Sequence, residues 1–223
     1  MKLSILPGSL WIAYTMTTRG AADIATLIPE HTRLVQTKLL SSDGVSENPL
    51  LLFNAYKVAS RWMNGNRIDI QTVVEDVDTG HQHLVILDVL TDTLDWNPVQ
   101  GIRLPNTRFH TAFDRLNDTG TFRYEYHARS GRKVLKVNAT ADKKTDIDYR
   151  FAVEANLECF YRTFSTAYSM GFDHATIASP VRTLDPISVE NAFWSAYRTP
   201  DVHRVFMHEH SMEFDVDVQN PFW

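Results

Sequence analysis

Apolar and polar residues alternate with a period of two along much of the chain, as is typical of antiparallel β-strands. Residues 67–74 alternate regularly, and residues 83–90 are apolar on both faces, which predicts a central strand. Asn64-Gly65, a pair common in tight hairpins, predicts a turn before the first of these strands. By the same pattern, further strands are expected within residues 1–16, 32–42, 49–60, 107–114, 121–129, 133–139, 173–178 and 203–218.

Helical spacing occurs in three shorter stretches. In residues 20–29, Ile24, Leu27 and Ile28 share one helical face, and Pro29 ends the segment. Aromatic residues recur at helical spacing in residues 154–169, and a further helix is expected over residues 188–197. No repeat, linker or low-complexity tract interrupts the chain. The pattern therefore predicts a single α+β domain over residues 1–223, dominated by antiparallel strands.

Composition and charge narrow the functional classes. The formal net charge is −5, with 22 Lys and Arg against 27 Asp and Glu, and no basic cluster provides a phosphate-binding surface. Nucleic acid is therefore not an expected partner. The chain has no apolar run of about 18 residues, so no membrane-spanning helix is expected, and the cytoplasm is the default location. The single cysteine, Cys159, is expected to be an inert core thiol, and a homo-oligomer is left open.

Histidine supplies one candidate metal site. His81 and His83 form one His-x-His pair, and His208 and His210 form another. Residues two apart on a strand face the same side, so each pair can present two imidazoles to one metal ion. Surface or hydrogen-bonded histidines are the simpler interpretation, and no metal or cofactor is predicted. The chain also lacks the motifs of nucleophilic serine enzymes, phosphate-binding loops, dinucleotide-binding folds and zinc proteases.

Arginine within apolar strands is the remaining signal, at Arg67, Arg103, Arg108 and Arg123. Such side chains usually lie at strand edges with their charge in water. If Arg67 points inward, alternation places Asp69 and Gln71 on its face, and Ile68 and Ile70 on the opposite face. Asp69 would then be the resting partner of the guanidinium, which can form a fork for a carboxylate.

Two stretches of the chain resemble a known family. They are NRIDIQTVVEDVDTGHQHLVILDV, which begins at Asn66, and NPVQGIRLPNTRFHTA, which begins at Asn97. The order of an alternating strand, a glycine turn, an apolar strand ending in aspartate, and a Leu-Pro loop resembles acetoacetate decarboxylase-like proteins, and is most similar to their DUF2071-type relatives. The resemblance implies a cone-like, mostly antiparallel β-barrel with a cavity and a few helices packed outside.

The same resemblance also shows where this chain differs from the family in its catalytic residues. Decarboxylases of this family carry a lysine that forms a Schiff base with the ketoacid, in a loop that here reads Arg103-Leu104-Pro105-Asn106-Thr107. Asn106 takes the place of the nucleophile, and Arg67 takes that of a strand glutamate. No lysine lies between Lys57 and Lys133. Schiff-base decarboxylation is therefore not expected.

These features predict a small-molecule-binding barrel whose ligand is a small carboxylate or carbonyl compound. If the protein is an enzyme of lyase type, Arg67, Asn106 and Arg108 would stabilise an enolate-like charge, and His110 would carry the proton. A non-catalytic carrier or regulatory binding protein is the alternative. A metal-dependent barrel enzyme that uses the His-x-His pairs is a weaker alternative.

Overall fold

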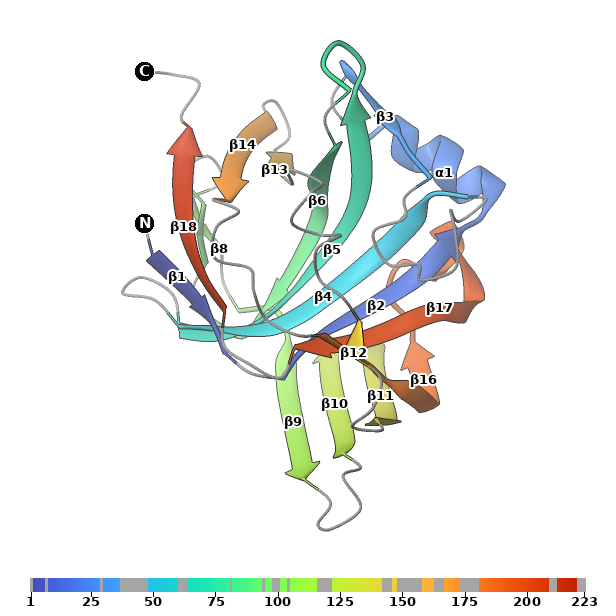
Figure 1. Ribbon diagram of the computed structural model, residues 1–223, viewed down its shortest axis with the longest axis vertical. Helices are drawn as coiled ribbons and strands as arrows, with labels where there is room; N and C mark the ends of the chain where they lie inside the picture. The colour runs from blue at the N-terminus through green and yellow to red at the C-terminus, as the bar shows by residue number, and fades with distance from the viewer. Residues whose placement is uncertain are drawn as a thin grey trace.

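The structure is a computed structural model of the chain, and it is dominated by β-strands (Figure 1). It describes residues 2–6, 8–28, 30–36, 48–59, 64–80, 82–93, 95–97, 101–103, 105–115, 122–141, 146–147, 158–162, 167–172, 181–208 and 212–219.

The first half of the described chain contains one helix and eight strands. They are β1 (Lys2–Ile5), β2 (Ser9–Met16), α1 (Thr18–Ala25), β3 (Thr32–Leu34), β4 (Leu50–Ala59), β5 (Asn64–Asp76), β6 (Gln82–Thr91), β7 (Asp95–Asn97) and β8 (Gly101–Arg103). The second half contains β9 (Arg108–Arg115), β10 (Phe122–Ser130), β11 (Lys133–Ala141), β12 (Asp146–Ile147), β13 (Glu158–Arg162), β14 (Ala167–Phe172), β15 (Val181–Thr183), β16 (Asp185–Asn191), η2 (Ser195–Tyr197), β17 (Arg198–His208) and β18 (Met212–Gln219).

The largest sheet curls until it meets itself. Its twelve strands run in the order β12-β15-β17-β2-β4-β1-β18-β14-β13-β6-β5-β3, and β4 also pairs with β5. Through this extra pairing, strands β4, β1, β18, β14, β13, β6 and β5 form a closed ring (Figure 1). The pairings within the sheet are antiparallel except for β13 with β6, which is parallel. The predicted α+β class with a mostly antiparallel, curled sheet is confirmed.

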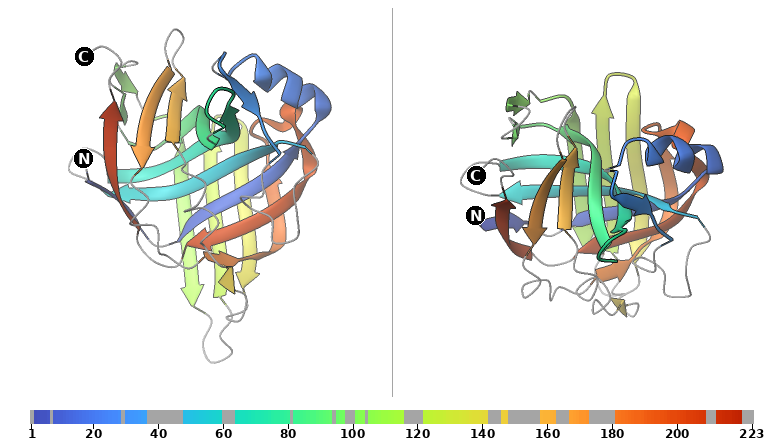
Figure 2. Two further views of the ribbon diagram at one scale, coloured as in Figure 1. Left: turned by 45° about the horizontal axis from the view of Figure 1, so that its top comes forward. Right: turned by 90° about the horizontal axis from the view of Figure 1, so that it is seen from above.

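A second sheet of four strands, in the order β16-β11-β10-β9, packs against the convex face of the first (Figure 2). The hydrophobic core lies between the two sheets. It joins Phe53 of β4 and Ile70 of β5 to Val137 of β11, and α1 contributes Ile24. Because these side chains are almost completely removed from water, their burial is the main source of stability for this arrangement.

Strand β5 separates this core from the interior of the ring. Ile68, Ile70 and Val74 belong to the core cluster, as the alternation of residues 67–74 predicts. Arg67, Asp69 and Gln71 therefore stand on the opposite, concave face. The β5–β6 pairing shifts between Ile70 and Gln71, whose partners are Asp88 and Ile86, so one residue of β6 is unpaired at this bulge.

Several predicted elements agree with the structure. Strands β4, β5 and β6 and the meander β9–β11 lie at the predicted places, and β6 is central, between β5 and β13. The predicted first strand is two strands, β1 and β2, and the predicted final strand is also two, β17 and β18. The strand predicted at residues 173–178 lies outside the described residues. The assignment of the chain to a single domain stays a prediction.

Two predicted helices are wrong. Residues 154–169 contain strand β13 and the first residues of β14, so Cys159 lies on a strand. Residues 188–197 contain the end of β16 followed by the short 3-10 helix η2. Aromatic residues form strands readily, and helical spacing in a short run does not exclude a strand. Pairing with other strands gives these segments their extended conformation, since β13 pairs with β6, β14 with β18, and β16 with β11. These partners are distant in the sequence.

The hairpin turn predicted at Asn64-Gly65 is also wrong. Both residues belong to β5, where Gly65 is the register partner of Val58. A Cβ atom at Gly65 would lie 1.7 Å from the Thr93 side chain and 2.6 Å from Asp92 Oδ1. Asp92 in turn accepts hydrogen bonds from the backbone and side chain of Asn66. The glycine therefore permits the close approach of a neighbouring segment, a common reason for glycine within a strand.

Helix α1 begins at a capped residue, because the Thr17 hydroxyl accepts a hydrogen bond from the Gly20 amide at 2.9 Å. The helix starts and ends earlier than the predicted segment 20–29. Its Gly20 packs directly on η2, where a Cβ atom would lie 2.0 Å from the Tyr197 carbonyl oxygen. Among the described residues, no helix has the length and apolar character needed to cross a membrane.

Replacing Gly20 by alanine tests this close packing. In an exposed helix this change adds about 1 kcal/mol of stability. Here the added methyl group meets a backbone carbonyl, so we expect Gly20→Ala to lower the free energy of unfolding by about 1–3 kcal/mol. Ala22→Gly, at an exposed position of the same helix, should lower it by about 1 kcal/mol. Urea denaturation measures both, and a stabilised Gly20→Ala protein would contradict the described packing.

Candidate functional site

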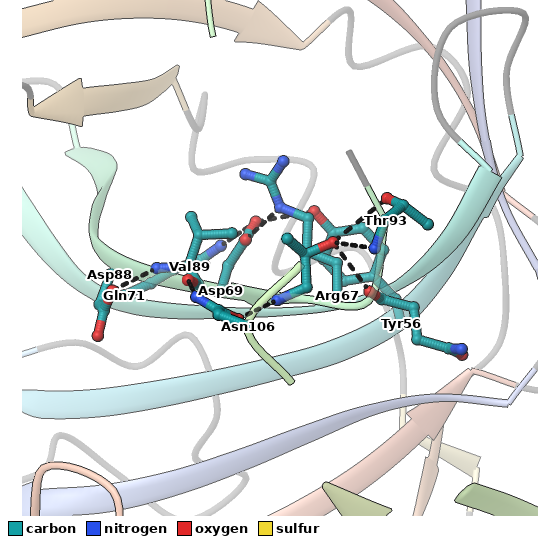
Figure 3. A network of polar contacts seen from close by, with 10 residues as sticks. Tyr56, Arg67, Asp69, Gln71, Asp88, Val89, Thr93 and Asn106 are labelled. Carbon is teal, nitrogen blue, oxygen red and sulfur yellow. Dashed lines mark hydrogen bonds and ion pairs between the residues drawn. The ribbon is translucent and has the colours of Figure 1, made fainter. Parts of the chain in front are cut away.

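A row of polar side chains lies on the concave face of strands β4 and β5 (Figure 3). Arg67 and Asp69 are each 3% exposed, and Gln71 is 2% exposed. Charged side chains are rarely buried to this degree unless they are paired. The row is therefore the candidate site.

Asp69 is the centre of this row. Its Oδ1 atom is 2.5 Å from Arg67 Nε, and its Oδ2 atom accepts a hydrogen bond from the Tyr56 hydroxyl at 2.8 Å (Figure 3). Gln71 Nε2 donates a longer bond of 3.4 Å to the same Oδ2 atom. The carboxylate thus has a charged donor on one oxygen and neutral donors on the other, which compensates for its removal from water.

Cross-strand register explains why these residues meet. Tyr56 is directly opposite Arg67, and Asn54 is directly opposite Asp69. Residues opposite one another on paired strands point to the same face of the sheet. Tyr56 and Asn54 were not predicted as site residues. The signal for Asn54 in the sequence is a polar residue within the otherwise apolar run LLLFNAY.

Apolar residues flank the polar row on the same face. Leu52 is the partner of Gln71, and Val89 is the partner of Asp69. Both are buried, yet neither belongs to the core between the sheets. A few fixed polar groups among apolar side chains are typical of sites for small molecules.

Asn106 lies next to this row but is bound to the backbone. Its Oδ1 atom accepts hydrogen bonds from the Thr91 amide at 3.0 Å and from the Thr107 hydroxyl at 2.7 Å, and its Nδ2 donates to the Val89 carbonyl at 3.4 Å. Thr91 is the register partner of Arg67, so the loop that carries Asn106 docks one strand away from the guanidinium. In this arrangement the Asn106 amide holds the loop against β6.

Arg108 and His110 lie elsewhere. Both are exposed residues of β9, which belongs to the four-stranded sheet. Arg108 is opposite Arg129, and His110 is opposite His127, with the two imidazole rings 6.0 Å apart. The structure therefore brings Arg67 and the Asn106 loop together but places Arg108 and His110 on a different, solvent-exposed surface. Their catalytic roles stay predictions.

The metal hypothesis rests on residues that are only partly described. His81 and His210 lie outside the described residues, as do the side chains of His83 and His208. The side chains of Arg103 and Arg123 also lie outside the described residues. Within the described part of the chain, no group of three His, Cys, Asp or Glu side chains could hold a metal ion.

A second buried arginine was not predicted. Arg198 is 6% exposed, and its guanidinium carbon lies 3.7 Å from the centre of the Tyr14 ring and 6.0 Å from that of Phe53. Its terminal nitrogens donate hydrogen bonds to the Asn191 and Thr199 carbonyls, at 2.6 and 3.0 Å. Burial raises the pKa of Tyr14, which the charge of Arg198 partly offsets. The aromatic rings and the carbonyl groups thus offset part of the cost of burying this cation, and burial lowers the pKa of Arg198.

Comparison with known proteins identifies the class of fold. The chain resembles the crystal structure of acetoacetate decarboxylase from Legionella pneumophila, with a TM-score of 0.61 and 9% sequence identity, over 100% of this chain and 88% of that one. A second acetoacetate decarboxylase structure gives a TM-score of 0.58 and 8% identity, over 100% of this chain and 91% of that one. The chain therefore has an acetoacetate decarboxylase-like fold. No protein-family model and no curated protein matches its sequence.

The buried ion pair makes a first prediction for the site. Arg67→Leu leaves Asp69 as a buried charge without its cation, so we expect the free energy of unfolding to fall by about 3–5 kcal/mol. Replacing both residues by leucine should give a more stable protein than either single change, because no uncompensated charge remains. In the exposed pair of Arg33 and Glu75, each single change should cost at most about 1 kcal/mol. Urea denaturation of the variants measures these differences, and additive losses at Arg67 and Asp69 would contradict the pairing.

Tyr14 predicts an alkaline loss of stability. Its pKa is raised by burial, so the folded and unfolded states both hold the neutral phenol below about pH 10. Above that pH the unfolded state loses the proton first, and the free energy of unfolding falls by up to about 1.4 kcal/mol per pH unit until the folded pKa is passed. Tyr14→Phe should remove this part of the slope. Denaturant unfolding between pH 9 and 11 measures the difference, and equal slopes in the two proteins would contradict it.

Proposed function

We propose that the protein binds a small organic carboxylate on the concave face of β4 and β5, with Arg67 as the anchor. The observation that carries the proposal is the bonding of Asp69. This carboxylate is held by Tyr56 and Gln71 as well as by Arg67. It therefore keeps donors of its own when the guanidinium turns to a second carboxylate.

An exchange of partners of this kind keeps the guanidinium paired, because both the resting partner and the ligand are carboxylates. Asp69 loses its cation in the exchange, and the neutral donors Tyr56 and Gln71 offset part of that cost. Guanidinium groups bind carboxylates through two parallel N–H donors, a geometry that lysine does not provide. The neighbouring apolar residues Leu52 and Val89 suit the carbon chain of such a ligand.

Schiff-base chemistry of the kind implied by the family resemblance has no support at this site. Of the lysines with described side chains, Lys57 and Lys133 are exposed, and Lys136 pairs with Glu190 on the outer face of the four-stranded sheet. The position implied for the nucleophile is Asn106, whose amide binds the backbone of β6. Fold similarity alone does not carry an activity to a new protein.

The second candidate function is that of a carrier or a regulatory protein, which binds its ligand without converting it. His110, the residue predicted to carry a proton, is exposed on β9 in the other sheet. A proton carrier must come within hydrogen-bond reach of the reacting group, so this position favours a binding role over lyase chemistry. Consumption of acetoacetate by the purified protein, dependent on Arg67, would favour the enzyme instead.

Titration calorimetry with a series of straight-chain carboxylates of two to six carbons tests carboxylate binding. We expect at least one of them to bind, and the matching neutral amide not to bind. The double variant Arg67→Leu and Asp69→Leu, chosen because it avoids an unpaired buried charge, should weaken binding by more than about tenfold, since a charged hydrogen bond contributes about 1.5–3 kcal/mol.

Arg129→Leu is the matched control, because this arginine is exposed on β10 and lies away from the proposed site. It should leave the affinity unchanged. Absence of binding across the whole series, or binding that survives loss of Arg67 and Asp69, would contradict the proposal.

A further inference from the structure

Two hydrogen-bond acceptors in the polar row lack a donor among the described residues. They are Gln71 Oε1 and Asn54 Oδ1. The two residues are 2% and 7% exposed, so bulk water does not reach them freely. Buried polar atoms nearly always have a partner, and an acceptor without a donor is unfavourable. Each of these atoms therefore calls for a physical explanation.

The orientation of the Gln71 amide is set by its neighbour. Nε2 donates to Asp69 Oδ2, and turning the amide over would place Oε1 against a carboxylate oxygen. Oε1 is therefore the atom left to accept a bond. Asn54 lies directly opposite Asp69 on β4, so its side chain stands on the same concave face as Gln71 and Arg67.

The row thus offers a cation at one end and acceptors further along. Arg67 Nε and Gln71 Nε2 bond to the two oxygens of the Asp69 carboxylate, at 2.5 and 3.4 Å, so the guanidinium and the Gln71 amide lie on either side of one carboxylate group. Asn54 lies opposite Asp69 on β4. A ligand carboxylate bound to Arg67 is therefore separated from these amides by no more than a short carbon chain, which can carry a hydroxyl group.

We propose that the ligand is a short hydroxycarboxylate, whose carboxylate binds Arg67 and whose hydroxyl donates to Gln71 Oε1 or Asn54 Oδ1. The inference rests on the proposed carboxylate site and defines its specificity. A keto group in place of the hydroxyl has no proton to donate, and its oxygen faces a second acceptor. An unsubstituted chain leaves the acceptors without a donor. Both analogues are therefore disfavoured.

A matched series of four-carbon acids tests this specificity by titration calorimetry. We expect 3-hydroxybutyrate to bind about tenfold more tightly than butyrate, the effect of one added hydrogen bond. Acetoacetate should bind no more tightly than butyrate. Gln71→Met and Asn54→Leu remove one acceptor each with little change in size, and the double variant should reduce the preference for the hydroxy acid to about twofold or less.

Asn138→Leu is the control, since this asparagine binds Ser188 on the outer sheet, and it should keep the full preference. Circular dichroism spectra establish that each variant is folded. If the three acids bind with equal affinity, and if the Arg67→Leu and Asp69→Leu double variant loses this binding, the hydroxyl inference is wrong and the carboxylate site is supported. Absence of binding by all three acids would overturn both. Preference for the hydroxy acid that survives loss of both amides would overturn the assignment to Gln71 and Asn54.

Discussion

This part of the structure depends on one constraint, the buried charge of Asp69. Asp69 lies on a strand whose other face lines the hydrophobic core. Its partners include Arg67 and Gln71 of its own strand and Tyr56 of β4. A shift of one residue in the pairing of β4 with β5 would turn Arg67 and Asp69 toward the core, and Ile68 and Ile70 away from it. The ion pair therefore opposes register errors, and the bulge on the other side of β5 adjusts β6 to the register that results.

This constraint links the fold to its chemistry. The closed ring places one face of β5 against its interior, and the four-stranded sheet covers the other face with apolar side chains. The polar residues are thereby confined to the interior of the ring. The similarity to acetoacetate decarboxylase structures, at 8–9% identity, concerns the fold and does not carry an activity to this chain. Among the described residues, the buried polar side chains on this face of β5 are Arg67, Asp69 and Gln71, and Asn54 and Tyr56 lie opposite them on β4.

Local patterns in the sequence predicted the parts of the structure that depend on local information. Alternation over residues 67–74 predicts which side chains share a face, and it predicts the pairing of Arg67 with Asp69 on the condition that Arg67 points inward, which the structure shows. It does not predict the Tyr56 contact, which needs the register between β4 and β5. Strands β13 and β14 were predicted as a helix because their ladders are formed with partners far along the chain. Gly65 was assigned to a turn because no pattern in the neighbouring sequence indicates its close contact with Thr93.

The two buried arginines among the described residues, Arg67 and Arg198, are held by different kinds of partner. Arg198 is held by the Tyr14 ring and by the backbone carbonyls of Asn191, at the end of β16, and of Thr199 on β17, and these carbonyls cannot move without displacing the strands that carry them. Arg67 donates to a side-chain carboxylate, and this carboxylate also has other donors. A partner on a side chain can be exchanged at small structural cost, whereas a partner on the backbone of a sheet cannot. This difference supports the proposal that Arg67, rather than Arg198, is the anchor for a ligand.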